Sequence, residues 1–271
     1  MGATTFEFDG DALRAAGSGA GLQAAAQALP DGAYSTLRTY GRDRVLRLAR
    51  HVARLNESAT LQGLTGALDE ERARKAIAQA LKATGHPESR LRLTYSPPRF
   101  FVSVEPFVAL PEALYRDGAA CVTVPLHRAN PHAKDTRFAA EAASAYAALP
   151  GGIQEGLMVA EDGSILEGLS SNFFGLIGGA LHTEEARALL GITRSLVLEV
   201  ARKVAPVMTE PVSLADIPSV AEAFITSVSR GILPVVRIDG VTVGDGHPGP
   251  VTRDLIGRFQ ALVDREALPL T

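Results

Sequence analysis

The glycine pair Gly178-Gly179 is the feature that most restricts how this 271-residue chain can fold. It separates two short apolar runs, 172–177 and 180–182. Two adjacent residues that readily adopt positive φ are typical of the tightest β-hairpin turns. A second turn is predicted at 161–163, again between apolar runs. The second half of the chain is therefore expected to consist largely of short strands joined by tight turns.

Elsewhere, apolar residues recur at either the helical or the strand spacing. From Val45 to Leu55 they recur at the helical spacing, which predicts a helix over 44–58. The first thirty residues, rich in Ala and Gly, are interpreted as a loop before a small helix. Further helices are expected at 68–84, 138–148 and 193–204. Strands are expected at 33–40, 90–96, 100–104, 121–124, 157–160, 164–167, 222–228 and 234–238.

This mixture of helices and strands predicts an α+β protein with two domains. A chain of this length can bury one large core or two smaller ones. The segment 111–118 is polar, begins with Pro and ends with Gly, and we interpret it as an interdomain linker. A small α/β domain is therefore expected over 1–110 and a larger mixed-sheet domain over 119–271.

Composition excludes several classes of protein. The net charge of −3 argues against a general nucleic-acid-binding protein. The single cysteine, Cys121, cannot form an intramolecular disulfide or a zinc cluster built on cysteine pairs, and we predict no metal site. No apolar run is long enough to span a membrane, and residues 1–30 lack the pattern of a signal peptide. We therefore expect a cytoplasmic protein.

Among the four lysines, Lys134 is the candidate for chemistry. Lys75 and Lys203 each follow a glutamate by four positions, as solvated helix pairs do, and Lys82 lies on the solvent side of its helix. Lys134 instead lies in a loop just before Asp135, which is suited to cap the next helix. The positive end of that helix would slightly lower the pKa of a nearby amine. From this local context alone, an ordinary surface lysine remains the simpler interpretation.

The helix predicted at 193–204 begins with an unfavourable charge. Arg194 falls in its first turn, where an exposed cation costs about 0.3–1 kcal/mol. A phosphate bound by the Thr193 hydroxyl and the amides after Gly191 would remove that cost. Arg54 could add a bidentate contact to the same phosphate. Alternatively, Thr193 caps the helix and Arg194 points into solvent. The hydroxyl-rich segment 226–229 is a further, weaker phosphate candidate.

Glu167 lies on a predicted strand, with Ile165 on the same face. A partly buried carboxylate needs a partner, and a protonated pyridine nitrogen would give it a strong charged hydrogen bond. In pyridoxal 5'-phosphate (PLP) chemistry such a pair keeps the ring an electron sink. A surface salt bridge would explain Glu167 equally well.

Together these segments resemble the class IV aminotransferases, which are PLP enzymes of fold type IV. The group includes branched-chain aminotransferases, D-amino acid aminotransferases and aminodeoxychorismate lyases. The resemblance covers about residues 31–271. Its motifs are Tyr34–Tyr40, His51–Ala59, Gln154–Gly156, the Glu-x4-Asn segment Ser164–Phe174, Leu190–Arg194 and Phe224–Val235.

The resemblance implies a role for each candidate residue. Lys134 would bind PLP as a Schiff base and move the substrate proton in a ping-pong exchange between an amino acid and a 2-oxo acid. Glu167 would pair with the pyridine nitrogen, and Asn172 would brace its strand. The phosphate would be bound by Arg54, the amides of Ile192 and Thr193, the Thr193 hydroxyl, Ser227 and the position of Val228. The substrate would face Tyr34, Arg38 and Ser229. A homodimer is also implied.

The sequence departs from the family pattern at several positions. The first thirty residues lack the usual opening strand, and Val228 stands where a phosphate-binding threonine is frequent. Three alternatives therefore stay open. The chain could be a PLP-dependent lyase of the aminodeoxychorismate type, since 34–38 also resembles that subgroup. It could be a non-catalytic relative. A serine hydrolase is more distant, because 168–172 lacks the final glycine of the nucleophile elbow.

Overall fold

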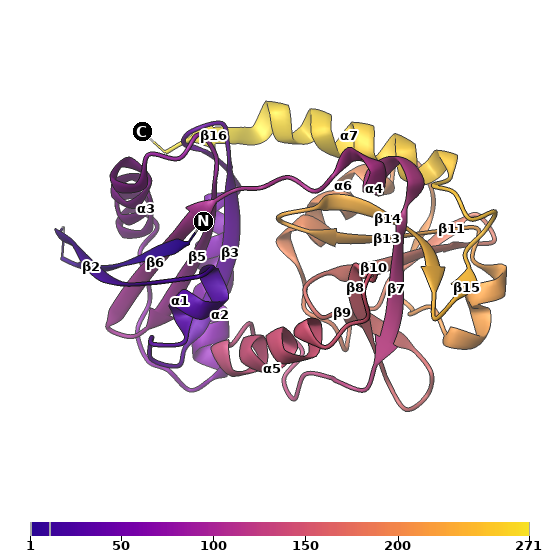
Figure 1. Ribbon diagram of the computed structural model, residues 1–271, viewed down its shortest axis with the longest axis horizontal. Helices are drawn as coiled ribbons and strands as arrows, with labels where there is room; N and C mark the ends of the chain where they lie inside the picture. The colour runs from indigo at the N-terminus through magenta and orange to yellow at the C-terminus, as the bar shows by residue number, and fades with distance from the viewer. Residues whose placement is uncertain (1, 11, 271) are drawn as a thin grey trace. The chain divides into compact units, whose positions relative to one another are not determined.

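A computed structural model describes residues 2–10 and 12–270 of the chain (Figure 1). It divides into two compact units. Unit 1 contains the residues up to 108, together with 133–140 and those from 263 onward, and unit 2 contains 109–132 and 141–262. The segment 111–118, expected as a linker, contains the short helix α4 (Glu112–Asp117) and falls within unit 2.

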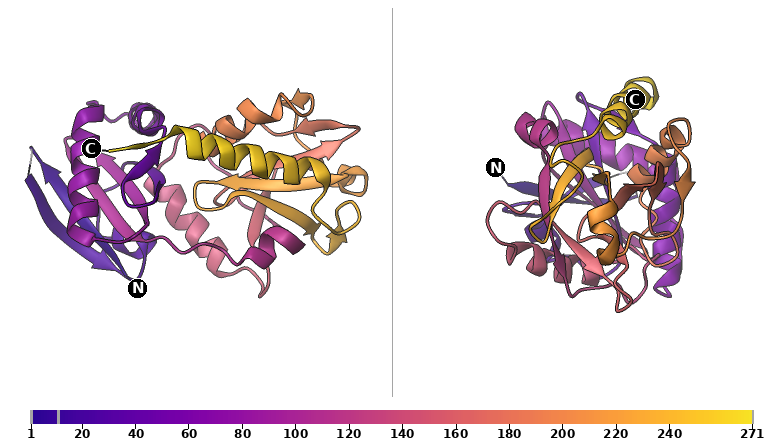
Figure 2. Two further views of the ribbon diagram at one scale, coloured as in Figure 1. Left: turned by 90° about the horizontal axis from the view of Figure 1, so that it is seen from above. Right: turned by 90° about the vertical axis from the view of Figure 1, so that its right-hand side faces the viewer.

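Unit 1 is built on a seven-stranded sheet with the strand order β16-β4-β3-β5-β6-β1-β2. The strands are β1 (Ala3–Asp9), β2 (Ala12–Gly19), β3 (Ala33–Tyr40), β4 (Arg44–Leu46), β5 (Ser89–Ser96), β6 (Arg99–Pro106) and β16 (Ala267–Pro269). The helices are α1 (Leu22–Ala26), α2 (Leu48–Leu61) and α3 (Glu70–Thr84). Strand β16 is far from β4 in the sequence but pairs with it. In the left view of Figure 2, the yellow segment that follows the last helix reaches the violet part of unit 1.

Strand alternation and helix periodicity explain the core of unit 1. Buried and partly buried residues alternate along β3, so Leu37 faces the core, where it joins Leu91 and Leu93 of β5. Helices α2 and α3 cover this face and contribute Leu55 and Ile77, while α1 packs on the other face. Each such fully buried side chain contributes about 1.5–3 kcal/mol. The predicted strand at 33–40 and helix at 68–84 are confirmed.

Two expectations for unit 1 are wrong. The first thirty residues do contain opening strands, the hairpin β1–β2, before the expected small helix α1. Strand β2 is an exposed edge, so its sequence carries no alternating apolar pattern. The helix expected over 44–58 begins only at Leu48. Residues 44–46 pair with both β3 and β16, and Arg47, at φ 53°, separates this short strand from α2.

Unit 2 is built on a nine-stranded mixed sheet with the order β12-β11-β10-β13-β14-β7-β8-β9, and β15 pairs with β14. Its strands are β7 (Ala119–Val124), β8 (Glu155–Val159), β9 (Ile165–Gly168), β10 (Asn172–Ile177), β11 (Ala180–His182), β12 (Val207–Met208), β13 (Glu222–Ser227), β14 (Gly231–Ile238) and β15 (Val241–Thr242). Its other elements are α6 (Ile192–Ala201) and the 3-10 helix η1 (Leu214–Ser219). Helices α5 (Thr136–Ala147) and α7 (Pro250–Glu266) include residues of both units.

The predicted hairpins of unit 2 are confirmed. Strands β10 and β11 pair around Gly178 and Gly179, whose φ values are 58° and 82°. Strands β8 and β9 pair around the turn at 161–163. In the described part of the chain, no helix is both long and apolar enough to cross a membrane.

Helix α7 was not predicted from the sequence. Its buried residues Leu255, Phe259 and Leu262 do follow the helical spacing, so the signal was present. The helix begins where Glu222, at the start of β13, accepts the amide protons of Val251 and Thr252 at 3.1 and 2.7 Å. The α7 N-terminus therefore already holds a carboxylate, which neutralises its partial positive charge.

Candidate active site

In unit 1, the backbone of Lys134 is fixed at the start of β3. Its carbonyl accepts the amide proton of Tyr34 at 2.9 Å, and its own amide donates to the Ser58 hydroxyl of α2 at 3.1 Å. The next residue, Asp135, forms a β-bridge with Ala33. The Lys134 Nζ lies 4.6 Å from the centre of the Tyr34 ring. Lys134 is therefore held by specific bonds on both sides, unlike a residue of an ordinary surface loop.

The residues that flank Lys134 explain this local structure. The Asp135 carboxylate accepts the Phe138 amide proton at 2.9 Å and caps α5, as the sequence predicts. Thr136 and Gly32 exchange two hydrogen bonds, at 3.0 and 3.1 Å. Gly32 also packs closely against β5, because a Cβ there would lie 2.4 Å from the Tyr95 carbonyl oxygen.

Arg54 lies in a buried polar group with Ser35 and His51. Its Nη2 donates to the Ser35 hydroxyl at 2.8 Å, and that hydroxyl lies 2.9 Å from His51 Nδ1. Burial lowers the pKa of His51 well below its ordinary value, and the nearby charges of Arg54 and Lys134 lower it further. The imidazole is therefore neutral, and the two cations carry the positive charge of this group.

The structure does not place Arg38 beside Lys134. It follows Tyr34 by four residues along β3, a separation of about 13 Å. Its guanidinium donates to Glu88 at 3.1 Å and stacks on Phe107, 3.5 Å from the ring centre. Arg92, which the sequence analysis missed, is instead the arginine next to Tyr34. It is 4% exposed and lies 4.2 Å from the ring centre.

In unit 2, Glu167 is buried on β9. Its Oε1 accepts a hydrogen bond from Arg128 Nε at 2.8 Å, and its Oε2 accepts one from Asn172 Nδ2 at 3.4 Å. The side chains of Arg128 and Glu167 are only 5% and 3% exposed. This pair is therefore not the surface salt bridge considered as an alternative. Arg128 was not predicted, although it lies in the same loop as Lys134, six positions earlier.

Asn172 connects this carboxylate to the start of α6. Its Nδ2 also donates to the Leu189 carbonyl at 2.7 Å. The approach is so close that a Cβ on Gly191, the residue before α6, would lie 2.3 Å from Asn172 Oδ1. Asn172 also stands opposite Thr226 in the pairing of β10 with β13, so both side chains lie on one face of the sheet.

At the α6 N-terminus, the alternative in which Thr193 caps the helix and Arg194 points into solvent is wrong. Within the described part of the chain, no side chain caps the helix, so Thr193 is not its cap. Arg194 is 3% exposed and does not point into solvent. Its Nη2 instead donates at 3.2 Å to both the Glu184 carbonyl and the Glu185 carboxylate. The first turn contains no acidic residue, and among the described residues no side chain caps it, whereas Glu222 accepts the first amide protons of α7.

The third phosphate candidate lies at the end of β13. The strand ends at Ser227, and Val228, Ser229 and Arg230 form the turn to β14. Among the described residues, the buried Thr226 Oγ1 has no hydrogen-bond partner. It belongs to the strand that packs against α6. Val228 has no hydroxyl group, so it can offer a ligand only its backbone.

The sequence pattern of the family described as amino-transferase class IV matches residues 32–238, which is more than half of the chain. The chain belongs to the class IV aminotransferases. It is an enzyme of this family, as the order of its motifs predicts.

Relatives and solved structures agree with this assignment. A relative from Methanocaldococcus jannaschii, provisionally named a branched-chain-amino-acid aminotransferase, is 26% identical over 85% of this chain and 86% of its own length. The branched-chain aminotransferase of Thermoproteus uzoniensis, solved with norvaline, has a TM-score of 0.81 at 22% identity over 100% of both chains. A further branched-chain amino acid aminotransferase, solved with pyridoxamine 5'-phosphate, has a TM-score of 0.77 at 24% identity, covering 86% of this chain and 85% of that one. These structures establish the fold.

Membership of the class IV aminotransferases implies PLP, and the residues present fit its chemistry. Glu167 is a buried carboxylate that a ring nitrogen could share with Arg128 and Asn172. The first turn of α6 offers amides without a carboxylate, which suits a phosphate. Thr226 Oγ1, buried and unpartnered among the described residues, is a further polar atom on this face.

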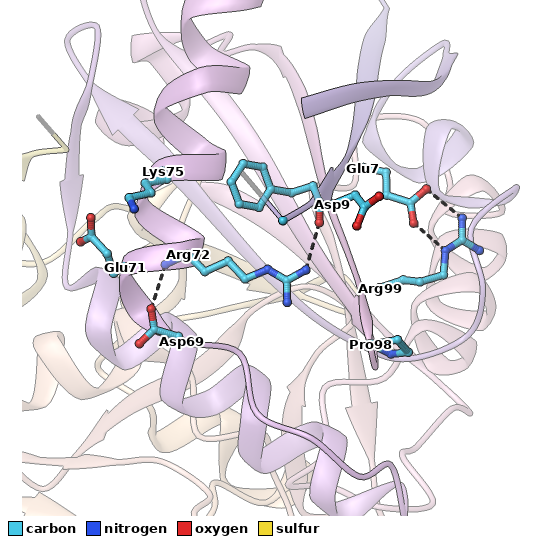
Figure 3. A pocket seen from close by; sticks show the side chains of 10 residues that line it. Glu7, Asp9, Asp69, Glu71, Arg72, Lys75, Pro98 and Arg99 are labelled. Carbon is cyan, nitrogen blue, oxygen red and sulfur yellow. Dashed lines mark hydrogen bonds and ion pairs between the residues drawn. The ribbon is translucent and has the colours of Figure 1, made fainter. Parts of the chain in front are cut away.

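A separate hollow of about 570 Å³ in unit 1 does not belong to this site (Figure 3). It lies at the start of α3, and none of the predicted site residues lines it. Glu7 and Arg99 bind each other there with two bonds of 2.7 and 3.0 Å, and the Asp69 carboxylate caps α3. Its main charges are therefore committed to structural contacts.

Proposed function

We propose that this class IV aminotransferase transfers an amino group between an amino acid and a 2-oxo acid by a ping-pong mechanism, with PLP attached to Lys134. One observation carries the proposal. The buried Glu167 carboxylate accepts hydrogen bonds from Arg128 and Asn172. Asn172 also donates a hydrogen bond to the Leu189 carbonyl, just before the start of α6, which no side chain of the described residues caps. Strands β9 and β10 thus offer a partner for a ring nitrogen, and the adjoining start of α6 offers a partner for a phosphate.

When bound, PLP supplies an electron sink for the substrate Cα and a carbon that carries the amino group between the two half-reactions. Lys134 holds the cofactor through its amine and then moves the proton at the substrate Cα. Glu167 binds and orients the ring, with Arg128 as its counter-charge. The phosphate is bound by the amides of Ile192 and Thr193, the Thr193 hydroxyl, Ser227, the backbone at Val228, and Arg54.

The substrate is proposed to meet Tyr34 and the amides near Ser229. Arg38, which the resemblance also assigns to the substrate, is engaged by Glu88 and Phe107. A branched-chain amino acid is the first donor to test, because several relatives carry the name of a branched-chain aminotransferase.

The test is a half-reaction with purified protein and PLP. One amino acid at a time, in its D- or L-form, is added without any 2-oxo acid, and the extracted cofactor is separated by chromatography. The expected product is pyridoxamine 5'-phosphate, which 2-oxoglutarate then converts back to PLP. Release of pyruvate with the cofactor returned as PLP would instead indicate the lyase alternative.

Attachment at Lys134 is tested by borohydride reduction followed by peptide mass spectrometry. The reduced cofactor is expected on the peptide that contains Lys134. Lys134→Ala should abolish both the attachment and the half-reaction. Lys82→Ala is the matched control, because Lys82 is exposed on α3 in the same unit. Attachment in Lys134→Ala would refute the assignment.

A further inference from the structure

Glu155, on β8 of unit 2, is a fully buried carboxylate that the proposed chemistry does not use. Its Oε2 accepts hydrogen bonds from the hydroxyls of Ser170 and Ser171 at 2.8 and 2.9 Å and from Arg230 Nη1 at 2.6 Å. Gly168 permits this packing, because a Cβ there would lie 2.8 Å from Glu155 Cγ. One carboxylate oxygen thus holds three side chains.

Arg230 is fixed at both ends. Its Nη2 donates to the Tyr146 hydroxyl at 2.7 Å, and its backbone carbonyl accepts from the Tyr115 hydroxyl at 2.9 Å. Burial disfavours the charged guanidinium and is the largest single influence, but the charge and hydrogen bond of Glu155, with smaller contributions from Tyr146 and Cys121, together outweigh it, so the pKa of Arg230 is raised. The pair is therefore a buried, charged hydrogen bond. Removing either partner would leave the other charge uncompensated.

The partners of Glu155 come from two turns that the proposed function requires. Ser170 and Ser171 form the turn between β9 and β10, directly between Glu167 and Asn172. Arg230 ends the turn between β13 and β14, directly after Ser229. The first turn carries the residues proposed for the ring nitrogen, and the second carries residues proposed for the phosphate.

We propose that Glu155, together with Arg230, is a positioning residue that fixes these two turns relative to each other and so sets the affinity for PLP. The inference rests on the proposed function for its effect on PLP. The two turns themselves can be examined without any cofactor. Neither residue is proposed to touch the reacting atoms, because each acts through its neighbours.

The first measurement is hydrogen exchange in the protein without cofactor. Glu155→Gln keeps the shape of the side chain and removes its charge. It is expected to raise amide exchange in both 168–172 and 227–231. Glu222→Gln is the matched control, since Glu222 is another buried carboxylate of unit 2 but holds the start of α7. It should raise exchange near 250–253 only. A change confined to one turn in Glu155→Gln would overturn the inference.

The second measurement is the dissociation constant of PLP, from equilibrium dialysis. Glu155→Gln and Arg230→Met should each raise it about tenfold or more, as expected for an uncompensated buried charge. Arg230→Lys keeps the charge and should retain more affinity than Arg230→Met. The absorbance maximum of bound PLP should shift in Glu155→Gln and stay at the wild-type position in Glu222→Gln. Equal affinity in Glu155→Gln and wild type would overturn the inference.

These results separate the two proposals. A wild-type protein that binds no PLP would refute the proposed function, while exchange at both turns would still support the link through Glu155. A wild-type protein that binds PLP, with normal turns and affinity in Glu155→Gln, would refute only the positioning role.

Discussion

Tyr34 contacts Lys134 twice: its amide donates to the lysine carbonyl at 2.9 Å, and its ring lies 4.6 Å from the lysine Nζ. The first contact fixes the backbone of the lysine, and the second orients its side chain. The aromatic face also stabilises the positive charge of the amine. Position 34 therefore controls the proposed attachment residue, independently of any contact with substrate.

Substitution of the Tyr34 ring should separate these two effects. Tyr34→Phe keeps the ring and the backbone bond, so attachment of PLP to Lys134 should proceed at nearly the wild-type rate. Tyr34→Leu removes the aromatic face and should slow attachment, because the amine loses its fixed orientation. The rate is followed by absorbance after PLP is added. Equal rates in Tyr34→Leu and wild type would contradict this role.

Removal of Arg128 should destabilise the protein through Glu167. Arg128→Met leaves a buried carboxylate without its counter-charge, at a cost of about 3–5 kcal/mol in the free energy of unfolding. The double variant Arg128→Met/Glu167→Gln should recover part of that loss, because it leaves no buried charge unpaired. Urea denaturation measures both. If the double variant lost more free energy of unfolding than the two single variants lost together, the result would argue against the pair.

The close approach at Gly191 predicts a local effect on cofactor binding. Gly191→Ala places a Cβ 2.3 Å from Asn172 Oδ1, so Asn172 or the start of α6 must move. We expect a loss of about 1–3 kcal/mol in stability and weaker PLP binding. Gly151→Ala is the matched control, because a Cβ there meets nothing within 4 Å. Calorimetry and dialysis provide the two readouts, and similar behaviour of the two variants would contradict the prediction.

His51 predicts how stability depends on pH. Its pKa in the folded protein lies well below the value of about 6.5 for an unfolded chain. The unfolded state therefore binds more protons in the range between the two values, and stability falls as the pH drops below about 6.5. Above that pH the contribution is fully present. His51→Gln should flatten this part of the stability curve, measured by urea denaturation from pH 7.5 to 5. An unchanged slope would show that other groups govern it.

The sequence predicts an element where one local signal is enough to specify it. The glycine pair 178–179 specifies its hairpin because both residues have positive φ, and α3 ends at Gly85 in the left-handed conformation. Strand β4 could not be predicted, because it depends on pairing with β16, far away in the sequence. The helical spacing of apolar residues that starts at Val45 led us to expect a helix there instead.

The site divides in the same way. The family resemblance implies that Asn172 braces the strand of Glu167, and the Asn172 side chain donates to Glu167 Oε2 across one tight turn. Arg128 and Arg92 were missed because each is positioned by tertiary structure, without a repeating local pattern. Arg38 is held by Glu88, which is remote from it in the sequence. Arg194 is held by Glu185, which belongs to no local sequence pattern.

The pairing of β16 with β4 affects the order in which the chain can fold. The sheet that carries Tyr34 gains this edge strand only from residues 267–269. On a ribosome, the whole of unit 2 is synthesised before that strand exists. Unit 1 must therefore wait with an unpaired β4 edge while its neighbour folds. Until then, that open edge is available for pairing with a wrong strand.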